Sequence, residues 1–238
     1  MGVSECLKAW SSRGRMLLAA AAPKEVEAVA KPFGVATADL QPWRVTTIND
    51  RFDLLMTGVG KANAAGAVAR AFDPSRHVMV INLGVAGALP DVGVSIGDVV
   101  IGAVSVFADE GITTSDGFQD IADVGFPLLP SKRRACEPPP ELLQAVDDLG
   151  AAGVIATVSA CSGSDAQARA IRSRTGALVE AMEGAAIGLV VAWVNSIRGG
   201  DAPFLEIRTI SNTTGNREAQ VWDLPAALAS LSRVAARL

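Results

Sequence analysis

The chain has 238 residues, of which 50% are hydrophobic, 19% are charged and 5% are aromatic, a length that allows one large domain or two small ones. Its 21 basic and 25 acidic residues give a net charge of −4, which argues against a nucleic-acid or anionic-membrane surface. The chain has one histidine, His77, and no tyrosine. A metal site built from several histidines is therefore excluded, and a Ser–His or Cys–His pair could use only His77 as its base.

The cysteines and the N-terminal region indicate the compartment. Cys6, Cys136 and Cys161 are odd in number and widely spaced, so we expect neither a disulfide framework nor a zinc site, and a reducing cytoplasm is favoured. No apolar run reaches the roughly 18 residues of a membrane span. Residues 13–22 imitate a signal peptide, but a strand leading into a helix fits them better. We expect residues 1–15 to form a flexible extension.

Apolar runs alternate with alanine-rich helical stretches, and this alternation predicts one layered α/β domain over residues 16–238. Strands are expected over residues 17–22, 43–48, 52–57, 78–82, 97–107, 153–159, 177–181 and 204–210. Helices are expected over residues 24–31 (after Pro23), 61–72, 141–149, 165–174, 184–194 and in a last segment capped by Asp223.

Residues 109–140 interrupt this alternation. They are rich in Gly, Pro, Asp and Ser and show weak periodicity. A long irregular segment inside a compact domain is usually a functional loop or a disordered one. We expect a lid or a loop that contacts another subunit.

Glycines follow expected strands at three places, namely Gly58–Gly60, Gly84–Gly87 and Gly163. Gly58–Gly60 does not form a P-loop, because Leu55 and Ala62 stand where that motif needs Gly and Ser or Thr. Asn63 replaces the third glycine of a dinucleotide fingerprint, so a tight strand-to-helix turn is the favoured interpretation. Gly84–Gly87 is expected to be a turn after the central strand, where open α/β sheets bind ligands.

Buried or helix-start carboxylates are the next candidates. Glu25 lies in the first turn of a helix, where an acid is favoured electrostatically in any case. Glu183 lies where a strand passes into an apolar helix, so its carboxylate needs a partner or a polar ligand. His77 is expected to be a surface or strand-entry residue, and Cys161 a small buried hydrophobe.

Polar residues also mark the last strand. Arg208 and Asn212 fall at its end. Arg208 alternates outward from this apolar strand and, in the simplest interpretation, pairs with Glu206 or Asp223. From the residues alone, the sequence predicts an α/β domain with a carboxylate-lined site.

The segments Val179–Ala186 (VEAMEGAA) and Arg208–Asn212 (RTISN) resemble motifs of the nucleoside phosphorylase and nucleosidase superfamily, and the resemblance extends over residues 16–238. Segments 216–226 and 116–127 resemble its futalosine hydrolase branch, which serves the alternative menaquinone pathway. The resemblance implies a three-layer fold, with a mixed central sheet flanked by helices on both faces. It also implies hydrolysis of futalosine to hypoxanthine and dehypoxanthinyl futalosine, without cofactor or metal.

The resemblance implies catalytic roles for three residues. Glu25 would activate the attacking water, Arg208 would lie nearby, and Asn212 would handle the leaving base. The implied substrate-binding residues are Glu183, Met182, Ser211, Val85, Ala86 and Gly87. Glu183 would hold the ribose hydroxyls, and the glycine turn would flank base and ribose. Such chemistry needs carboxylates and hydrogen-bond donors but no histidine.

Departures from the family pattern refine the substrate. Asn212 stands where adenine-specific members carry Asp, and its amide NH2 suits the O6 and N7 acceptors of a 6-oxopurine. Residues 21–25 lack the Gly-Asp-Pro-x-Arg pattern of phosphorylases, and Val85 brings no hydroxyl, so water is favoured over phosphate. Ala181 appears as an extra position in the usual Glu-Met-Glu run, so no role is assigned to Glu180.

The alternatives are another purine nucleosidase, a phosphorylase acting on inosine, and a nucleoside-binding protein without catalysis. Aminofutalosine and methylthioadenosine stay open as substrates. The family's habit implies a homodimer, or else a tetramer, in which residues 107–128 lie near the neighbouring site. We expect a small-molecule nucleoside as the ligand, and no nucleic-acid or membrane partner.

Overall fold

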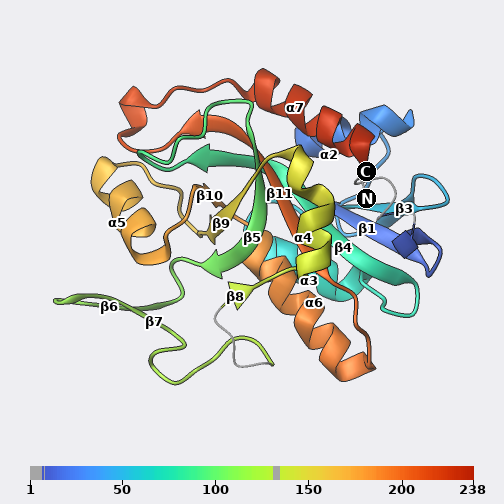
Figure 1. Cartoon of the computed structure of the whole chain (residues 1–238), viewed down its shortest axis with the longest axis horizontal. Helices are drawn as coiled ribbons and strands as arrows, with labels where there is room; N and C mark the ends of the chain where they lie inside the picture. The colour runs from blue at the N-terminus through green and yellow to red at the C-terminus, as the bar shows by residue number, and fades with distance from the viewer. Residues whose placement is uncertain (1–6, 8, 131–134) are drawn as a thin grey trace.

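In the computed structural model, which describes residues 7, 9–130 and 135–238, a nine-stranded mixed sheet runs through the molecule (Figure 1). Its strands are β1 (Arg15–Ala20), β2 (Val45–Thr47), β3 (Phe52–Met56), β4 (His77–Ala88), β5 (Val99–Phe107), β8 (Ala135–Cys136), β9 (Ala151–Thr157), β10 (Val179–Ala181) and β11 (Phe204–Thr213). Their order is β10-β9-β5-β11-β4-β1-β3-β2, and β8 pairs with β5.

Helices cover both faces of this sheet. They are α2 (Pro23–Ala30), α3 (Lys61–Ala71), α4 (Pro140–Val146), α5 (Asp165–Thr175), α6 (Gly184–Arg198) and α7 (Leu224–Arg237), with short 3-10 helices η1 (Lys31–Phe33), η2 (Asp147–Leu149) and η3 (Arg217–Ala219). No helix in the described ranges is long and apolar enough to cross a membrane.

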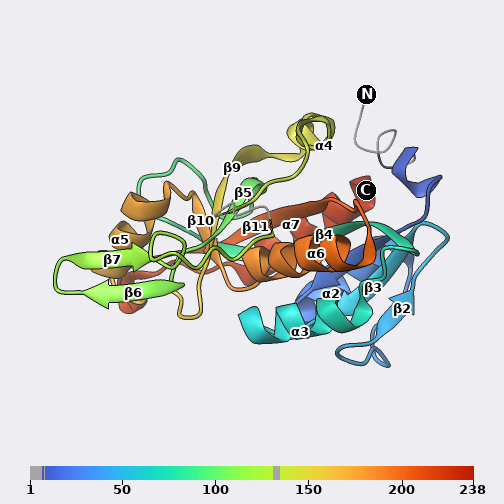
Figure 2. The same ribbon diagram turned by 90° about the horizontal axis from the view of Figure 1, so that it is seen from below.

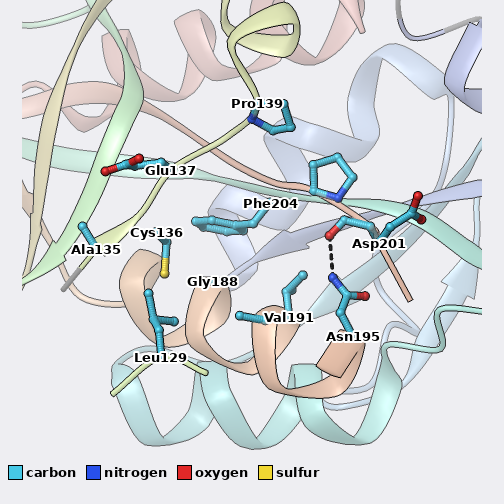
Figure 3. A pocket seen from close by; sticks show the side chains of 13 residues that line it. Leu129, Ala135, Cys136, Glu137, Pro139, Gly188, Val191, Asn195, Asp201 and Phe204 are labelled. Atoms are coloured by element: carbon cyan, nitrogen blue, oxygen red, sulfur yellow. Dashed lines mark hydrogen bonds between the residues drawn. The ribbon is translucent and has the colours of Figure 1, made fainter. Parts of the chain in front are cut away.

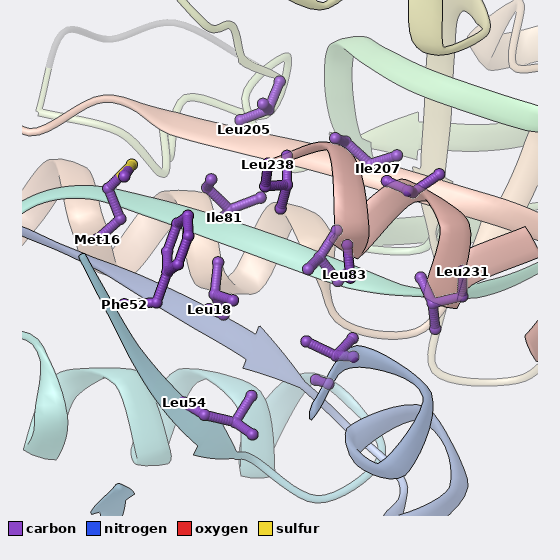
Figure 4. Packing of buried hydrophobic residues seen from close by; sticks show 14 of the residues in the cluster. Met16, Leu18, Phe52, Leu54, Ile81, Leu83, Leu205, Ile207, Leu231 and Leu238 are labelled. Atoms are coloured by element: carbon purple, nitrogen blue, oxygen red, sulfur yellow. The ribbon is translucent and has the colours of Figure 1, made fainter. Parts of the chain in front are cut away.

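The alternation of side chains along β1 builds two separate cores. Met16 and Leu18 face α2 and α7, and they pack in one cluster with Leu231 (Figure 4). Leu17 faces the other way and packs with Ile187 of α6 and with residues of α3. This arrangement confirms the expected three-layer α/β fold.

Strand β4 corrects one prediction. It extends through Ala88, so Gly84–Gly87 is strand and not a turn. The physical reason is its neighbour β11, which runs parallel to it and pairs Arg208 with Gly84 and Asn212 with Gly87. The polar end of β11 therefore lies beside the glycines of β4.

Residues 109–140 contain an antiparallel hairpin that the sequence pattern did not predict. Strands β6 (Gly111–Thr114) and β7 (Gly117–Asp120) form a separate two-stranded sheet. The hairpin projects from one end of the molecule in both views (Figure 1, Figure 2).

Two predictions concern the chain ends. Asp223 caps α7, because its side chain accepts a hydrogen bond from the backbone N–H of Ala226, at 2.9 Å. The extension expected over residues 1–15 falls partly outside the described residues. Within it, Leu7 is fully buried and packs in the cluster that contains Met16.

Candidate active site

Glu25 is held at the junction of β1 and α2. Pro23 occupies the first turn of α2, and Glu25 is the third helical residue, so its carboxylate turns back toward the helix start. Its Oε2 accepts from Ala22 N–H and its Oε1 from Val85 N–H, each at 2.8 Å. Burial raises the pKa of Glu25, although the nearby positive charge of Arg208 lowers it in part.

Arg208 is the buried cation of the site, with 1% of its surface exposed. Its Nε donates to Glu206 Oε1 at 2.8 Å, its Nη1 donates to Glu183 Oε2 at 3.2 Å, and its Nη2 donates to Asn82 Oδ1. Burial alone would lower the pKa of Arg208, but the surrounding carboxylates raise it. The expected pairing of Arg208 with Glu206 is confirmed. The expectation that Arg208 points outward is wrong, because this network keeps its charge inside.

Glu183 joins the same network from the start of α6. Its Oε1 accepts from the backbone N–H of Gly60 at 3.0 Å, and its Oε2 accepts from Arg208. The tight turn of Gly58–Gly60 thus supplies a hydrogen-bond donor to the site. Met182, the preceding residue, is partly exposed.

Two glycines let this network pack closely. A Cβ on Gly84 would lie 2.5 Å from Arg208 Nη1 and 2.6 Å from Glu25 Oε1. A Cβ on Gly184 would overlap the carboxylate of Glu206. The side chains of Glu25 and Arg208 therefore lie against the backbone of Gly84, where any side chain would collide with them.

Ser211 and Asn212 form a second group on β11. Ser211 Oγ lies 3.2 Å from Ala86 O and 2.8 Å from Asn212 Oδ1. Asn212 Nδ2 donates to Thr213 O at 2.9 Å. Because an amide NH2 carries two hydrogens, Asn212 keeps one donor for a ligand.

A cavity of about 330 Å³ lies next to this second group. Of the predicted site residues, Asn212 and Gly87 line it. The full lining is Gly87, Cys161, Ser162, Gly163, Glu180, Asn212, Arg217, Gln220 and Trp222. Cys161 is exposed here, so the expectation that it is a buried hydrophobe is wrong.

The sequence pattern assigns no role to Glu180 and indicates Glu206 as a partner of Arg208, but not as a ligand of Ser105. Glu180 is buried, and its two oxygens accept from the N–H and the hydroxyl of Ser162, both at 2.7 Å. Burial raises the pKa of Glu180. Glu206 is also fully buried and binds Ser105 Oγ at 2.6 Å as well as Arg208. A carboxylate within an apolar strand was the available signal for both.

Two other polar features lie apart from this region. A cavity of about 240 Å³ between α6, β8 and the start of β11 contains Asn195, whose Nδ2 donates to Ala202 O at 2.8 Å (Figure 3). His77 begins β4, as expected for a strand-entry residue, and bonds to Asp53 at 3.1 Å. Within the described part of the chain, no group of three or more His, Cys, Asp or Glu could hold a metal ion.

Known proteins resemble this chain over nearly its whole length. The family model described as the phosphorylase superfamily matches residues 16–238. Futalosine hydrolase of Streptomyces coelicolor is 32% identical over 94% of this chain and 94% of its own length. Futalosine hydrolase of Acidothermus cellulolyticus is 35% identical, over 94% and 90%. The structure of Helicobacter pylori futalosine hydrolase matches with a TM-score of 0.69 at 16% identity, over 94% and 97%.

Proposed function

The chain belongs to the phosphorylase superfamily, and we propose that it is a hydrolase that cleaves the N-glycosidic bond of futalosine. The products are hypoxanthine and dehypoxanthinyl futalosine, in a step of the alternative menaquinone pathway. Three curated relatives, at 32%, 35% and 33% identity, carry the name futalosine hydrolase. The site's residues support the same reaction class.

The observation that carries this proposal is the buried carboxylate of Glu25 beside Arg208. A phosphorylase must hold an anion at the nucleophile's position. Arg208 is already engaged by Glu206 and Glu183, and the negative charge of Glu25 repels phosphate. Water is neutral and can donate a hydrogen bond to Glu25, so it is the nucleophile that this arrangement favours.

In the proposed reaction, Glu25 takes a proton from water as the water oxygen bonds to C1′ of the ribose and the bond from C1′ to the purine nitrogen breaks. Positive charge develops on the sugar, close to the Glu183 carboxylate, which holds the ribose hydroxyls beside Met182. Asn212, with Ser211 bound to its Oδ1, donates to the departing hypoxanthine, where negative charge collects. The base finally gains one proton, so that one water is consumed.

The strand segment Val85–Gly87 completes the proposed site. The backbone N–H of Val85 donates to Glu25, Ala86 O lies 3.2 Å from Ser211 Oγ, and Gly87 lines the cavity. This segment would therefore lie along base and ribose.

A substrate panel tests the proposal. Base release is followed by chromatography with futalosine, aminofutalosine, inosine and methylthioadenosine, each with and without phosphate. We expect hypoxanthine from futalosine at a rate that phosphate does not change. Formation of a sugar 1-phosphate would indicate a phosphorylase. Faster base release from methylthioadenosine would indicate another nucleosidase, and binding without turnover would indicate a nucleoside sensor.

The proposal also covers assembly and location. We propose a homodimer in which the 107–128 segment lies near the neighbouring site, and the exposed Ile112 and Phe126 in and beside the β6–β7 hairpin support this. Light scattering would measure the mass, and a tetramer is the competing outcome. The free thiols of Cys136 and Cys161 support a cytoplasmic location.

A further inference from the structure

Trp222 lies directly opposite Asn212. The two residues form an antiparallel bridge, flanked by hydrogen bonds from Thr213 N to Val221 O at 3.0 Å and from Asp223 N to Ser211 O at 2.9 Å. This pattern makes Asn212 and Trp222 a non-hydrogen-bonded pair, in which facing side chains point to the same side and approach closely. Any group that Asn212 binds in the cavity therefore comes within reach of the Trp222 indole.

Trp222 is a large apolar surface left half uncovered. It is 51% exposed although it lines the cavity. The guanidinium of Arg217 lies 5.0 Å from the centre of its ring. Among the described residues that line the cavity, Trp222 alone is aromatic, and Cys161 is too small to offer a flat surface.

Gln220 fixes the indole in this position. Its Oε1 accepts from Trp222 Nε1 at 3.1 Å and from Arg217 Nη1 at 2.9 Å. Its Nε2 donates to Ser162 O at 2.9 Å and to Gly215 O at 3.0 Å. All four hydrogen bonds of the amide are thus made, and they connect the Trp222 segment to the loop on the other side of the cavity.

We propose that Trp222 is a base-binding residue of this site, against whose ring the flat purine packs, and that Gln220 is the positioning residue that holds the ring there. The inference rests on the proposed function, since it takes Asn212 to face the leaving base. Every purine presents a π-face, so Trp222 supplies affinity, while Asn212 selects the base by its hydrogen bonds. Because the contact exists before and during bond cleavage, it affects KM more than kcat.

Binding of hypoxanthine and cleavage of futalosine test this assignment together. In the wild type, hypoxanthine should quench part of the tryptophan fluorescence. Trp222→Ala should weaken hypoxanthine binding about tenfold and raise KM by a similar factor, with kcat within about threefold. Trp222→Phe should keep most of the affinity, because the ring is still aromatic. It should lose the quenching, because the quenched indole is gone, while Trp10, Trp43 and Trp193 still supply a fluorescence signal.

Two further variants separate the contact made by the Trp222 ring from the effect of Gln220, which positions that ring. Val221→Ala changes the neighbouring residue, which is 60% exposed and does not line the cavity, and should alter neither signal. Gln220→Ala should weaken binding in the wild type but add nothing in the Trp222→Ala background, because it acts through the ring.

The outcomes distinguish a failure of the Trp222 contact from a failure of the proposed hydrolase function. Quenching that persists in Trp222→Phe, or unchanged affinity and KM in Trp222→Ala, would overturn the assignment of Trp222 and leave the hydrolase proposal intact. Additive losses in the double variant would overturn the role of Gln220. A wild type that neither binds hypoxanthine nor cleaves futalosine would overturn the proposed function itself, and this inference with it.

Discussion

Gly84 is the position where one added carbon atom most directly disturbs the two opposite charges of the site. In Gly84→Ala, the new Cβ would meet Arg208 Nη1 at 2.5 Å and Glu25 Oε1 at 2.6 Å. Ordinary contacts need about 3.5–4.0 Å, so one or both groups must move by about 1 Å. Both side chains are buried and hydrogen-bonded, so the movement displaces the proposed general base.

A misplacement of about 1 Å at a reacting group costs about 100-fold in rate, and overpacking costs about 1–3 kcal/mol of stability. We therefore expect Gly84→Ala to fold with a Tm lowered by about 2–10 °C and to lose about 100-fold in kcat for hypoxanthine release. Gly153→Ala is the matched control, because its Cβ crowds Leu178, an apolar side chain outside the described site. A Gly84→Ala enzyme within threefold of wild-type kcat, with a Tm loss like the control's, would refute this reasoning.

Three further predictions address the charges and the base. Since burial raises the pKa of Glu25 above its ordinary 4.5 and the base must be ionised to act, kcat should fall with decreasing pH at a midpoint above 4.5; a pH profile flat to pH 4.5 would contradict this. Asn212→Asp should shift the ratio of kcat/KM at least tenfold from inosine toward adenosine, since a carboxylate accepts from a 6-amino group, and an unchanged ratio would count against the role of Asn212. Glu206→Gln should lower the free energy of unfolding, measured with denaturant, by about 3–5 kcal/mol, because it leaves the buried Arg208 charge undercompensated. The control Glu218→Gln, at an exposed position, should lower it by less than about 0.5 kcal/mol. Equal losses in the two variants would contradict the network.

Local patterns were sufficient to predict the elements that place Glu25. The apolar run of β1, Pro23 at the helix start and an acid two residues later specify a strand that turns into a helix, whatever surrounds them. The same holds for α7, where Asp223 precedes a helical repeat of apolar residues. These signals lie within a few residues of each other.

Long-range contacts explain what the patterns missed. The length of β4 depends on β11, more than 100 residues later, so Gly84–Gly87 resembled a turn until its partner was known. Glu206 meets Ser105 across a sequence separation of 101 residues, and Glu180 meets Ser162 across 18. The sequence indicated Arg208 as a partner of Glu206, two residues away, but it did not show the distant Ser105 or the partner of Glu180.

The central claim is that Glu25 activates water for cleavage of the glycosidic bond. It is tested most directly by hypoxanthine release from futalosine in phosphate-free buffer, measured for wild type, Glu25→Gln and the exposed control Glu27→Gln. Glu25→Gln leaves one of two backbone N–H groups without an acceptor, a cost of about 1–3 kcal/mol that a folded domain tolerates. We predict a folded Glu25→Gln protein with turnover reduced by about 10²–10⁴-fold, beside an unaffected control. Wild-type turnover in folded Glu25→Gln would contradict the assignment of the base.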